Sequence, residues 1–200
     1  MSKFTLKNSR FQKTIKEFLN ANPSVLDVFL YGSAAKGKRE PRDVDLVAVF
    51  CDKADDRAAH ELEKNLKASG VKADVEARSW KELFETSFLP REAVLAEGVS
   101  LKNGRPLSEA FGFKSFTLFR YSLKGFTPTR RVQFHYALNG RKKAGGMLAS
   151  VDGKKFTSST CLAPTAKSEE FAEFLRDWKI EFKQSFVLIP AKTVNYLDLR

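Results

Sequence analysis

One short stretch of the chain, residues 29–50, constrains the fold more than any other. An apolar segment ends at Gly32-Ser33, a basic turn follows, and a second apolar segment begins at Asp43-Val44-Asp45. Because the side chains of a strand alternate between its two faces, Asp43 and Asp45 point to the same side. Two carboxylates on one face repel each other unless a cation lies between them. The stretch therefore predicts two strands joined by a short turn, with a cation site at the start of the second strand.

The chemistry of this turn favours a nucleotide as well as a cation. Mg²⁺ takes oxygen ligands from one or two carboxylates together with the phosphates of a substrate. Gly32-Ser33 stands at the end of the first strand and offers backbone amides and a hydroxyl, which suit phosphate oxygens. We therefore predict a site for a metal-bound nucleoside triphosphate.

The order of these motifs carries a family resemblance. Gly32-Ser33, nine further residues and then Asp43-Val44-Asp45 resemble the signature of the polymerase-beta-type nucleotidyltransferase superfamily, and the resemblance covers residues 10–112. It implies an α+β fold with a mixed sheet and flanking helices. It also implies Mg²⁺-dependent chemistry with two ions, for which Mn²⁺ could substitute. In that reaction a nucleoside monophosphate passes from ATP or another nucleoside triphosphate to an acceptor hydroxyl, and pyrophosphate is released.

The resemblance further implies a third carboxylate on the strand expected at residues 71–79. Asp74 is the first choice, because Asp74-Val75-Glu76 is similar to the family's pattern, and Glu76 on the same face is the alternative. The basic contact to the triphosphate stays open among Lys36, Lys38, Arg39 and Arg42, and we take Lys36. The expected catalytic metal ligands are Asp43, Asp45 and Asp74, and the expected nucleotide contacts are Gly32, Ser33 and Lys36.

The positive charge of the chain is concentrated in one segment. Of a formal net charge of +11, residues 113–160 supply +9, with ten Lys or Arg and one Asp, whereas residues 1–112 hold 19 basic and 17 acidic residues. A local block of this kind favours binding of a polyanion. We place a nucleotidyltransferase domain at 1–112 and a small basic α+β domain at 113–200, with nucleic acid, RNA above all, as the expected acceptor. The expected contacts to nucleic acid are Arg130, Arg131, Arg141, Lys142 and Lys143.

The second domain is expected to contain strands and helices in the order β-α-β-β-α-β, compatible with a small split-βαβ sandwich. Thr127-Pro128 favours a helix over residues 128–138. Strict alternation of Val132, Phe134, Tyr136 and Leu138, followed by the hairpin signal Asn139-Gly140, favours a strand instead. We prefer the helix. A hairpin is expected from residues 147–151 and 156–162, followed by a helix at 168–178 and a strand at 180–189.

The composition argues against several other classes of protein, namely zinc-binding, disulfide-rich and membrane-spanning proteins. Two Cys and two His supply neither a zinc ligand set nor a disulfide framework. No run of about 18 apolar residues is present, so we expect no membrane span and a cytoplasmic protein. Two alternatives stay open for the function. One is a minimal nucleotidyltransferase that modifies a protein partner, as in antitoxin-like enzymes, and the other is a non-catalytic nucleic-acid-binding protein on the same fold.

Overall fold

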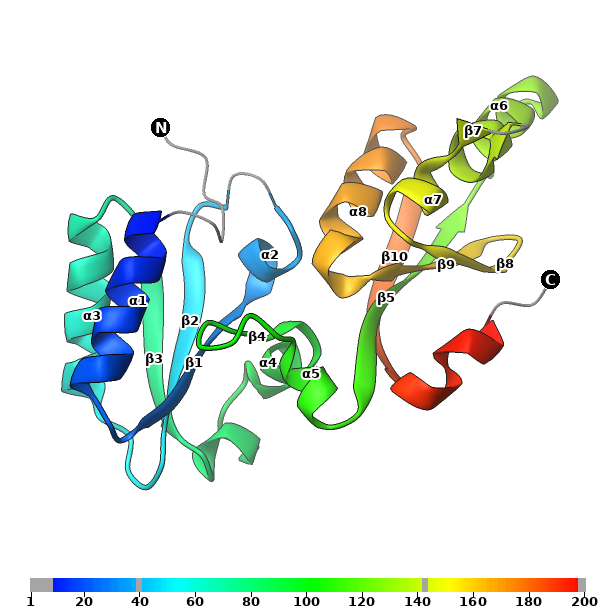
Figure 1. Cartoon of the computed structure of the whole chain (residues 1–200). Helices are drawn as coiled ribbons and strands as arrows, with labels where there is room; N and C mark the ends of the chain where they lie inside the picture. Colours follow the sequence, from blue (N-terminus) through cyan, green and yellow to red (C-terminus); the bar gives the residue numbers. More distant parts are fainter. Residues whose placement is uncertain (1–8, 39–40, 142–143, 198–200) are drawn as a thin grey trace. The chain divides into compact units, whose positions relative to one another are not determined.

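The fold comes from a computed structural model, which describes residues 9–38, 41–141 and 144–197 (Figure 1). Contacts divide the chain into two compact units, Met1–Phe111 and Gly112–Arg200, whereas the sequence placed the boundary after residue 112. Each unit contains one four-stranded sheet with helices packed on it, which confirms the predicted α+β class. Within the described ranges, every helix is too short or too polar to cross a bilayer.

The first unit is built on a mixed sheet with strand order β3-β2-β1-β4. Its strands are β1 (Val25–Tyr31), β2 (Val44–Phe50), β3 (Ala73–Ser79) and β4 (Val99–Ser100). Strand β2 runs antiparallel to β1 and parallel to β3. Every residue of β2 except Asp45 is buried, as expected for a central strand covered on both faces. The sheet thus leaves one carboxylate of this strand in reach of a ligand.

Helices cover both faces of this sheet. One face packs against the apolar sides of α1 (Ser9–Ala21) and α3 (Asp56–Ala68), and the other packs against residues from η1 (Glu82–Phe84), α4 (Arg91–Glu97) and α5 (Leu107–Ala110) (Figure 1). Helix α3 begins where the Asp55 carboxylate accepts hydrogen bonds from the Arg57 and Ala58 amides at 2.9 and 3.1 Å, as an N-cap does. The single turn α2 (Gly32–Ala35) follows β1 directly. The helices therefore fix the strand ends from which the candidate site is built.

The second unit contains an antiparallel sheet with strand order β10-β5-β9-β8. Its main elements are β5 (Phe113–Ser122), α6 (Pro128–Asn139), β8 (Lys154–Thr157), β9 (Thr160–Pro164), α8 (Ser168–Asp177) and β10 (Glu181–Pro190). These follow the predicted β-α-β-β-α-β order. The smaller elements are β6 (Gly140–Arg141), β7 (Ala144–Gly145), α7 (Met147–Ser150), η2 (Thr165–Lys167) and η3 (Ala191–Leu197).

Segment 128–138 is a helix, as preferred, and not a strand. Thr127 Oγ1 accepts a hydrogen bond from the Arg130 amide at 3.3 Å and caps α6. The helix buries Phe134 and Leu138, four residues apart, while Val132 and Tyr136 stay exposed. The Phe134 ring packs against aromatic rings from three other segments, with centroid distances of 5.4 to 6.4 Å, namely Tyr121, Phe126, Phe174 and Trp178. Burial at a helical spacing outweighs the strand-like alternation of the sequence.

The hairpin predicted from residues 147–151 and 156–162 is wrong in both arms, because the first arm is helical and the turn of the observed hairpin lies inside the second. Residues 147–150 form α7, and the hairpin consists of β8 and β9. A helical turn buries Leu148 and Val151 together, three residues apart. The turn closes where Asp152 adopts φ 56° and the Gly153 amide donates to Leu148 O at 2.7 Å. The Asp-Gly pair therefore ends a helix and does not turn a hairpin.

Candidate active site

Three neighbouring strands of the first unit bring the predicted carboxylates together. Register pairs Tyr31 of β1 with Asp45 of β2, and Asp45 with Asp74 of β3. Residues paired in this way point to the same face of a sheet, so the phenol and two carboxylates form one row. Asp43 lies immediately before β2, on the same side as Asp45. The half-exposed Asp43 carboxylate also lies 3.6 Å from Lys72 Nζ.

The turn after β1 lies directly on this row. Gly32 has φ +72°, in the left-handed region, and a Cβ atom there would overlap Asp45 Oδ2. Glycine at this position therefore satisfies both the backbone conformation and the close approach of the Asp45 carboxylate. Ser33 follows at the start of α2, and its hydroxyl forms no hydrogen bond with any residue that the structure describes. The predicted nucleotide contacts Gly32 and Ser33 are thus next to the predicted metal ligand Asp45.

The carboxylates in and beside this row repel one another. Burial raises the pKa of Asp45, and the charges of Asp43 and Asp74 raise it further, while Lys36 acts in the opposite direction. Burial also raises the pKa of the Tyr31 phenol, with added contributions from Glu76, Asp45 and Asp74. Tyr31 therefore remains a protonated hydrogen-bond donor over the physiological range. The carboxylates carry excess negative charge that a cation would offset.

The donor chemistry of the row fits a hard divalent cation. Among the described residues, no cluster of three or more His, Cys, Asp or Glu side chains is already arranged around a common metal position. The acidic groups of the row, together with Asp43, are carboxylates, which are ligands that Mg²⁺ and Mn²⁺ accept. Asp45 stands between Asp43 and Asp74 and feels the charge of both. These three side chains are therefore the ones that could hold a metal together with substrate phosphates.

A buried acid beside the turn is missing from the sequence prediction. Glu97, the last residue of α4, has a side chain only 1% exposed, and its Oε1 lies 3.2 Å from Lys36 Nζ. Burial raises the pKa of Glu97, while Lys36 and the Gly32 backbone amide lower it. Lys36 thus lies beside the turn as predicted, but in an ion pair. A carboxylate at a helix C-terminus is unfavourable without a partner. The place of Glu97 at the end of a helix was therefore the one feature of the sequence that could have indicated a paired acid there.

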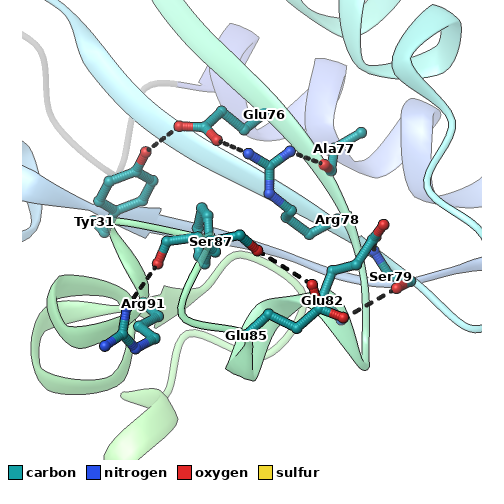
Figure 2. A network of polar contacts seen from close by, with 10 residues as sticks. Tyr31, Glu76, Ala77, Arg78, Ser79, Glu82, Glu85, Ser87 and Arg91 are labelled. Carbon is teal, nitrogen blue, oxygen red and sulfur yellow. Dashed lines mark hydrogen bonds and ion pairs between the residues drawn. The ribbon is translucent and has the colours of Figure 1, made fainter.

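Glu76, the alternative third carboxylate, is held by other side chains (Figure 2). Arg78 Nη2 donates to Glu76 Oε2 at 2.6 Å, and the Tyr31 hydroxyl donates to Glu76 Oε1 at 3.4 Å. The Arg78 guanidinium also donates to Ala77 O and lies over the Phe88 ring, 4.9 Å from its centroid. Both carboxylate oxygens of Glu76 are therefore engaged, whereas Asp74 is exposed on the same face.

The predicted basic contacts of the second unit are distributed around α6. Arg130 Nη2 donates to Trp178 O at 2.9 Å, and its guanidinium lies 4.2 Å from the Phe126 ring centroid. Arg131 Nε donates to Phe126 O at 3.2 Å. Arg141 lies over the exposed Tyr136 ring at 5.2 Å. Lys142 and Lys143 lie outside the described residues. The three described cations therefore have intramolecular contacts, two of them to backbone carbonyls.

The first unit matches a known protein family. Residues 13–99 match the family described as "Polymerase beta, Nucleotidyltransferase". The matched range includes the Gly32 turn, the Asp43–Asp45 pair, Asp74 and Glu97, and it ends before the basic second unit. The match confirms, for this part of the chain, the resemblance that the spacing of the motifs indicated. No curated protein sequence matches the chain.

Several solved structures resemble part of the chain. A toxin–antitoxin structure with AMP-PNP is 24% identical, covers 45% of this chain and 71% of its own, and has a TM-score of 0.36. A tri-AMPylated HEPN toxin of Shewanella oneidensis in complex with an MNT antitoxin is 21% identical, covers 50% and 76%, and has a TM-score of 0.35. Another Shewanella oneidensis structure is 17% identical, covers 52% and 80%, and has a TM-score of 0.36.

Proposed function

We propose that the protein transfers a nucleoside monophosphate from a nucleoside triphosphate to an acceptor hydroxyl, because residues 13–99 match the family described as "Polymerase beta, Nucleotidyltransferase". The acceptor oxygen forms a bond to the α-phosphorus, the bond from that phosphorus to the bridging oxygen breaks, and pyrophosphate leaves. The hydroxyl proton passes to water. The observation that carries this proposal is the row of Tyr31, Asp45 and Asp74 across three strands, with Gly32 against Asp45.

Asp43, Asp45 and Asp74 are the residues that would hold divalent metal, Mg²⁺ or Mn²⁺, as two ions. Bound metal supplies charge stabilisation for the attacking and leaving oxygens and lowers the pKa of the acceptor hydroxyl. The chain's own contribution is to keep the three carboxylates on one face at the start of β2 and β3. Their repulsion, which raises the pKa of Asp45 in the protein alone, supports this role.

The turn at Gly32 provides the contacts to the triphosphate in this proposal. The Ser33 amide and hydroxyl and the close-packed backbone of Gly32 would face phosphate oxygens, as such turns do in nucleotide sites. Lys36 would add positive charge from its place beside the turn. Its ion pair with Glu97 at 3.2 Å keeps the ammonium group close to the loop before nucleotide binds.

Asp74 is a better third carboxylate than Glu76. Arg78 and Tyr31 both donate to Glu76, so a metal would have to displace an existing ion pair to bind there. Asp74 is exposed and pairs in register with Asp45. Glu76 would then keep the Tyr31 hydroxyl and the Arg78 guanidinium in place beside the site. This role makes Glu76 a positioning residue.

Nucleic acid is the acceptor that the charge distribution supports best. The segment 113–160 carries +9, while the nucleotidyltransferase domain is close to neutral. Phosphate contacts dominate protein binding to nucleic acid, and Arg130, Arg131 and Arg141 are exposed cations on the same unit. We therefore propose an RNA hydroxyl as the acceptor.

The test compares nucleoside triphosphates labelled at the α- or γ-phosphate, incubated with the protein, Mg²⁺ and a cell extract that contains RNA and protein. We expect the α-label on a macromolecule and the γ-label in free pyrophosphate. Ribonuclease and protease digestion then identify the acceptor, and label on a protein would support the protein-modifying alternative. Asp45→Asn is the control. Transfer of α-label no greater than that control would contradict nucleotidyl transfer.

A further inference from the structure

The sheet of the second unit has two different faces. On one face, Phe119, Tyr121 and Phe182 pack with residues of α6 and α8 in the main core. The alternate residues of the same strands point the opposite way. Part of that second face is covered, where Val194 of η3 packs with Phe116, Leu162 and their neighbours. The part around Arg120, Lys183 and Thr157 is exposed to solvent, and we call this part the open sheet face.

A row of polar side chains crosses all four strands on the open sheet face. Register places Lys183 of β10 opposite Arg120 of β5, Arg120 opposite Thr160 of β9, and Thr160 opposite Thr157 of β8. Lys183, Arg120 and Thr157 are exposed, and Thr160 is half-buried. Because neighbouring strands lie about 4.8 Å apart, two cations and two hydroxyls stand next to one another along one line.

Among the described residues, no ion pair neutralises the positive charge of this row. Like charges directly opposite each other destabilise a sheet, yet neither Arg120 nor Lys183 forms an ion pair with any described residue. Glu181 is the one acidic residue that the four strands place on this face, and it pairs with Ser122. The open sheet face is therefore complementary to an anion.

We infer that the open sheet face binds the phosphate backbone of single-stranded nucleic acid, with Arg120 and Lys183 as its central contacts. Arg, Lys and Thr side chains are all common donors to phosphate oxygens, and an open sheet accommodates an extended strand. The inference rests on the proposed function, because it says where the acceptor nucleic acid lies.

The aromatic residues of β5 indicate that the open sheet face contacts the phosphate backbone of a nucleic acid and does not recognise its base sequence. On strand β5, Phe119 and Tyr121 face the helices, and Phe116, on the opposite face, is buried against Val194. None of these three rings is therefore available for base stacking. Binding should therefore show little sequence preference and a strong dependence on salt. Arg130 and Arg131 each donate one N–H to a backbone carbonyl, so each has fewer remaining donors for phosphate than Arg120 has.

The experiment measures fluorescence anisotropy of a labelled single-stranded RNA of mixed sequence, about 15 nucleotides long, titrated with the full-length protein. We expect the double variant Arg120→Gln/Lys183→Gln to weaken binding at least about tenfold at about 0.1 M salt. The slope of log Kd against log salt should fall by about 1.4, or 0.7 for each lost phosphate contact on a single strand. Arg120→Lys should keep most of the affinity.

Two matched double variants remove the same charge elsewhere. Lys64→Gln/Lys67→Gln on the exposed side of α3 should change Kd less than about twofold, because these residues are not part of the open sheet face. Arg130→Gln/Arg131→Gln tests the rival surface around α6. A larger loss for the α6 variant than for the sheet variant would overturn the inference, as would equal binding of wild type and the sheet variant.

Competition experiments show whether the open sheet face prefers nucleic acid to other polyanions. Unlabelled RNA should compete much better than tripolyphosphate or polyglutamate at equal charge, and equal competition by polyglutamate would contradict a nucleic-acid site. The titration contains neither nucleotide nor Mg²⁺. If the wild-type protein transfers nucleotide but does not bind RNA, this inference alone is overturned. If the wild-type protein binds RNA but transfers no nucleotide, the result counts against the proposed function alone. Unchanged near-ultraviolet circular dichroism shows that the sheet variant is folded.

Discussion

The ion pair between Lys36 and Glu97 gives the sharpest prediction about the turn beside the site. Lys36→Met keeps most of the side-chain volume but leaves the Glu97 carboxylate, 1% exposed, without its cation. Breaking a buried pair by removing one partner costs about 3–5 kcal/mol. Protonation of Glu97 sets an upper limit to this cost. Neutralising a carboxyl with an ordinary pKa of 4.5 at pH 7 costs about 3 kcal/mol, at about 1.36 kcal/mol per pH unit. Lys36 itself is 20% exposed, so we expect a loss of about 2–3 kcal/mol at pH 7.

The sign of the pH dependence follows from the direction of the pKa change. Burial already raises the pKa of Glu97, and loss of Lys36 raises it further. The folded state then binds more protons than the unfolded state, so stability falls as the pH rises above the unfolded pKa. The cost of Lys36→Met should therefore shrink to less than about 1 kcal/mol at pH 5. Glu97→Gln in the same chain should restore most of the stability lost at pH 7.

The assay is hydrogen exchange by mass spectrometry in increasing urea, on the full chain, following the amides of β2. A local probe is needed because two compact units need not unfold together. Glu97→Gln alone serves as the matched control. An equal loss at pH 5 and pH 7, or strictly additive effects in the double variant, would refute a charge-dependent pair.

Two further predictions concern the turn at Gly32 and the core of the second unit. Gly32→Ala places a Cβ on Asp45 Oδ2 at a φ of +72°, and should reduce nucleotidyl transfer at least about a hundredfold because the site shifts, as measured by α-label transfer; full activity would contradict the close packing. Phe134→Ala removes the ring at the centre of the α6 contacts, and should destabilise the second unit by about 3–5 kcal/mol. Hydrogen exchange should speed up in β5 and stay unchanged in β2, and equal acceleration in both strands would argue against separate units.

The sequence predicts the site best where the residues concerned lie close together along the chain. The Gly-Ser turn and the Asp-x-Asp strand lie within one strand–turn–strand segment, so local alternation was enough to place both carboxylates on one face. The parallel pairing of β2 and β3 then puts Asp74 opposite Asp45, on the strand where the family resemblance required a carboxylate. The helix at 128–139 was also predictable, because Thr127-Pro128 has the chemistry of a helix start.

Features that depend on contacts between distant segments were not predictable. Glu97 reaches Lys36 only because α4 ends beside the turn after β1, and no motif links these two positions. Lys183 stands opposite Arg120 only through the register of β10 and β5, so counting charge along the chain missed it. The hairpin error has the same origin, since burial of Leu148 and Val151 in the core decides for a helical turn. Long-range register and burial supply what local patterns lack.

The central claim, a metal site formed by Asp43, Asp45 and Asp74 in a nucleotidyltransferase, is tested most directly at the third carboxylate. Asp74→Asn and Glu76→Gln remove one negative charge each with little change of shape. The measurement is α-label transfer under identical Mg²⁺ and triphosphate concentrations. We predict a loss of at least about a hundredfold for Asp74→Asn and less than about tenfold for Glu76→Gln, because Asp74, and not Glu76, would hold metal together with Asp43 and Asp45. The reverse order, or wild-type activity of Asp74→Asn, would contradict the account.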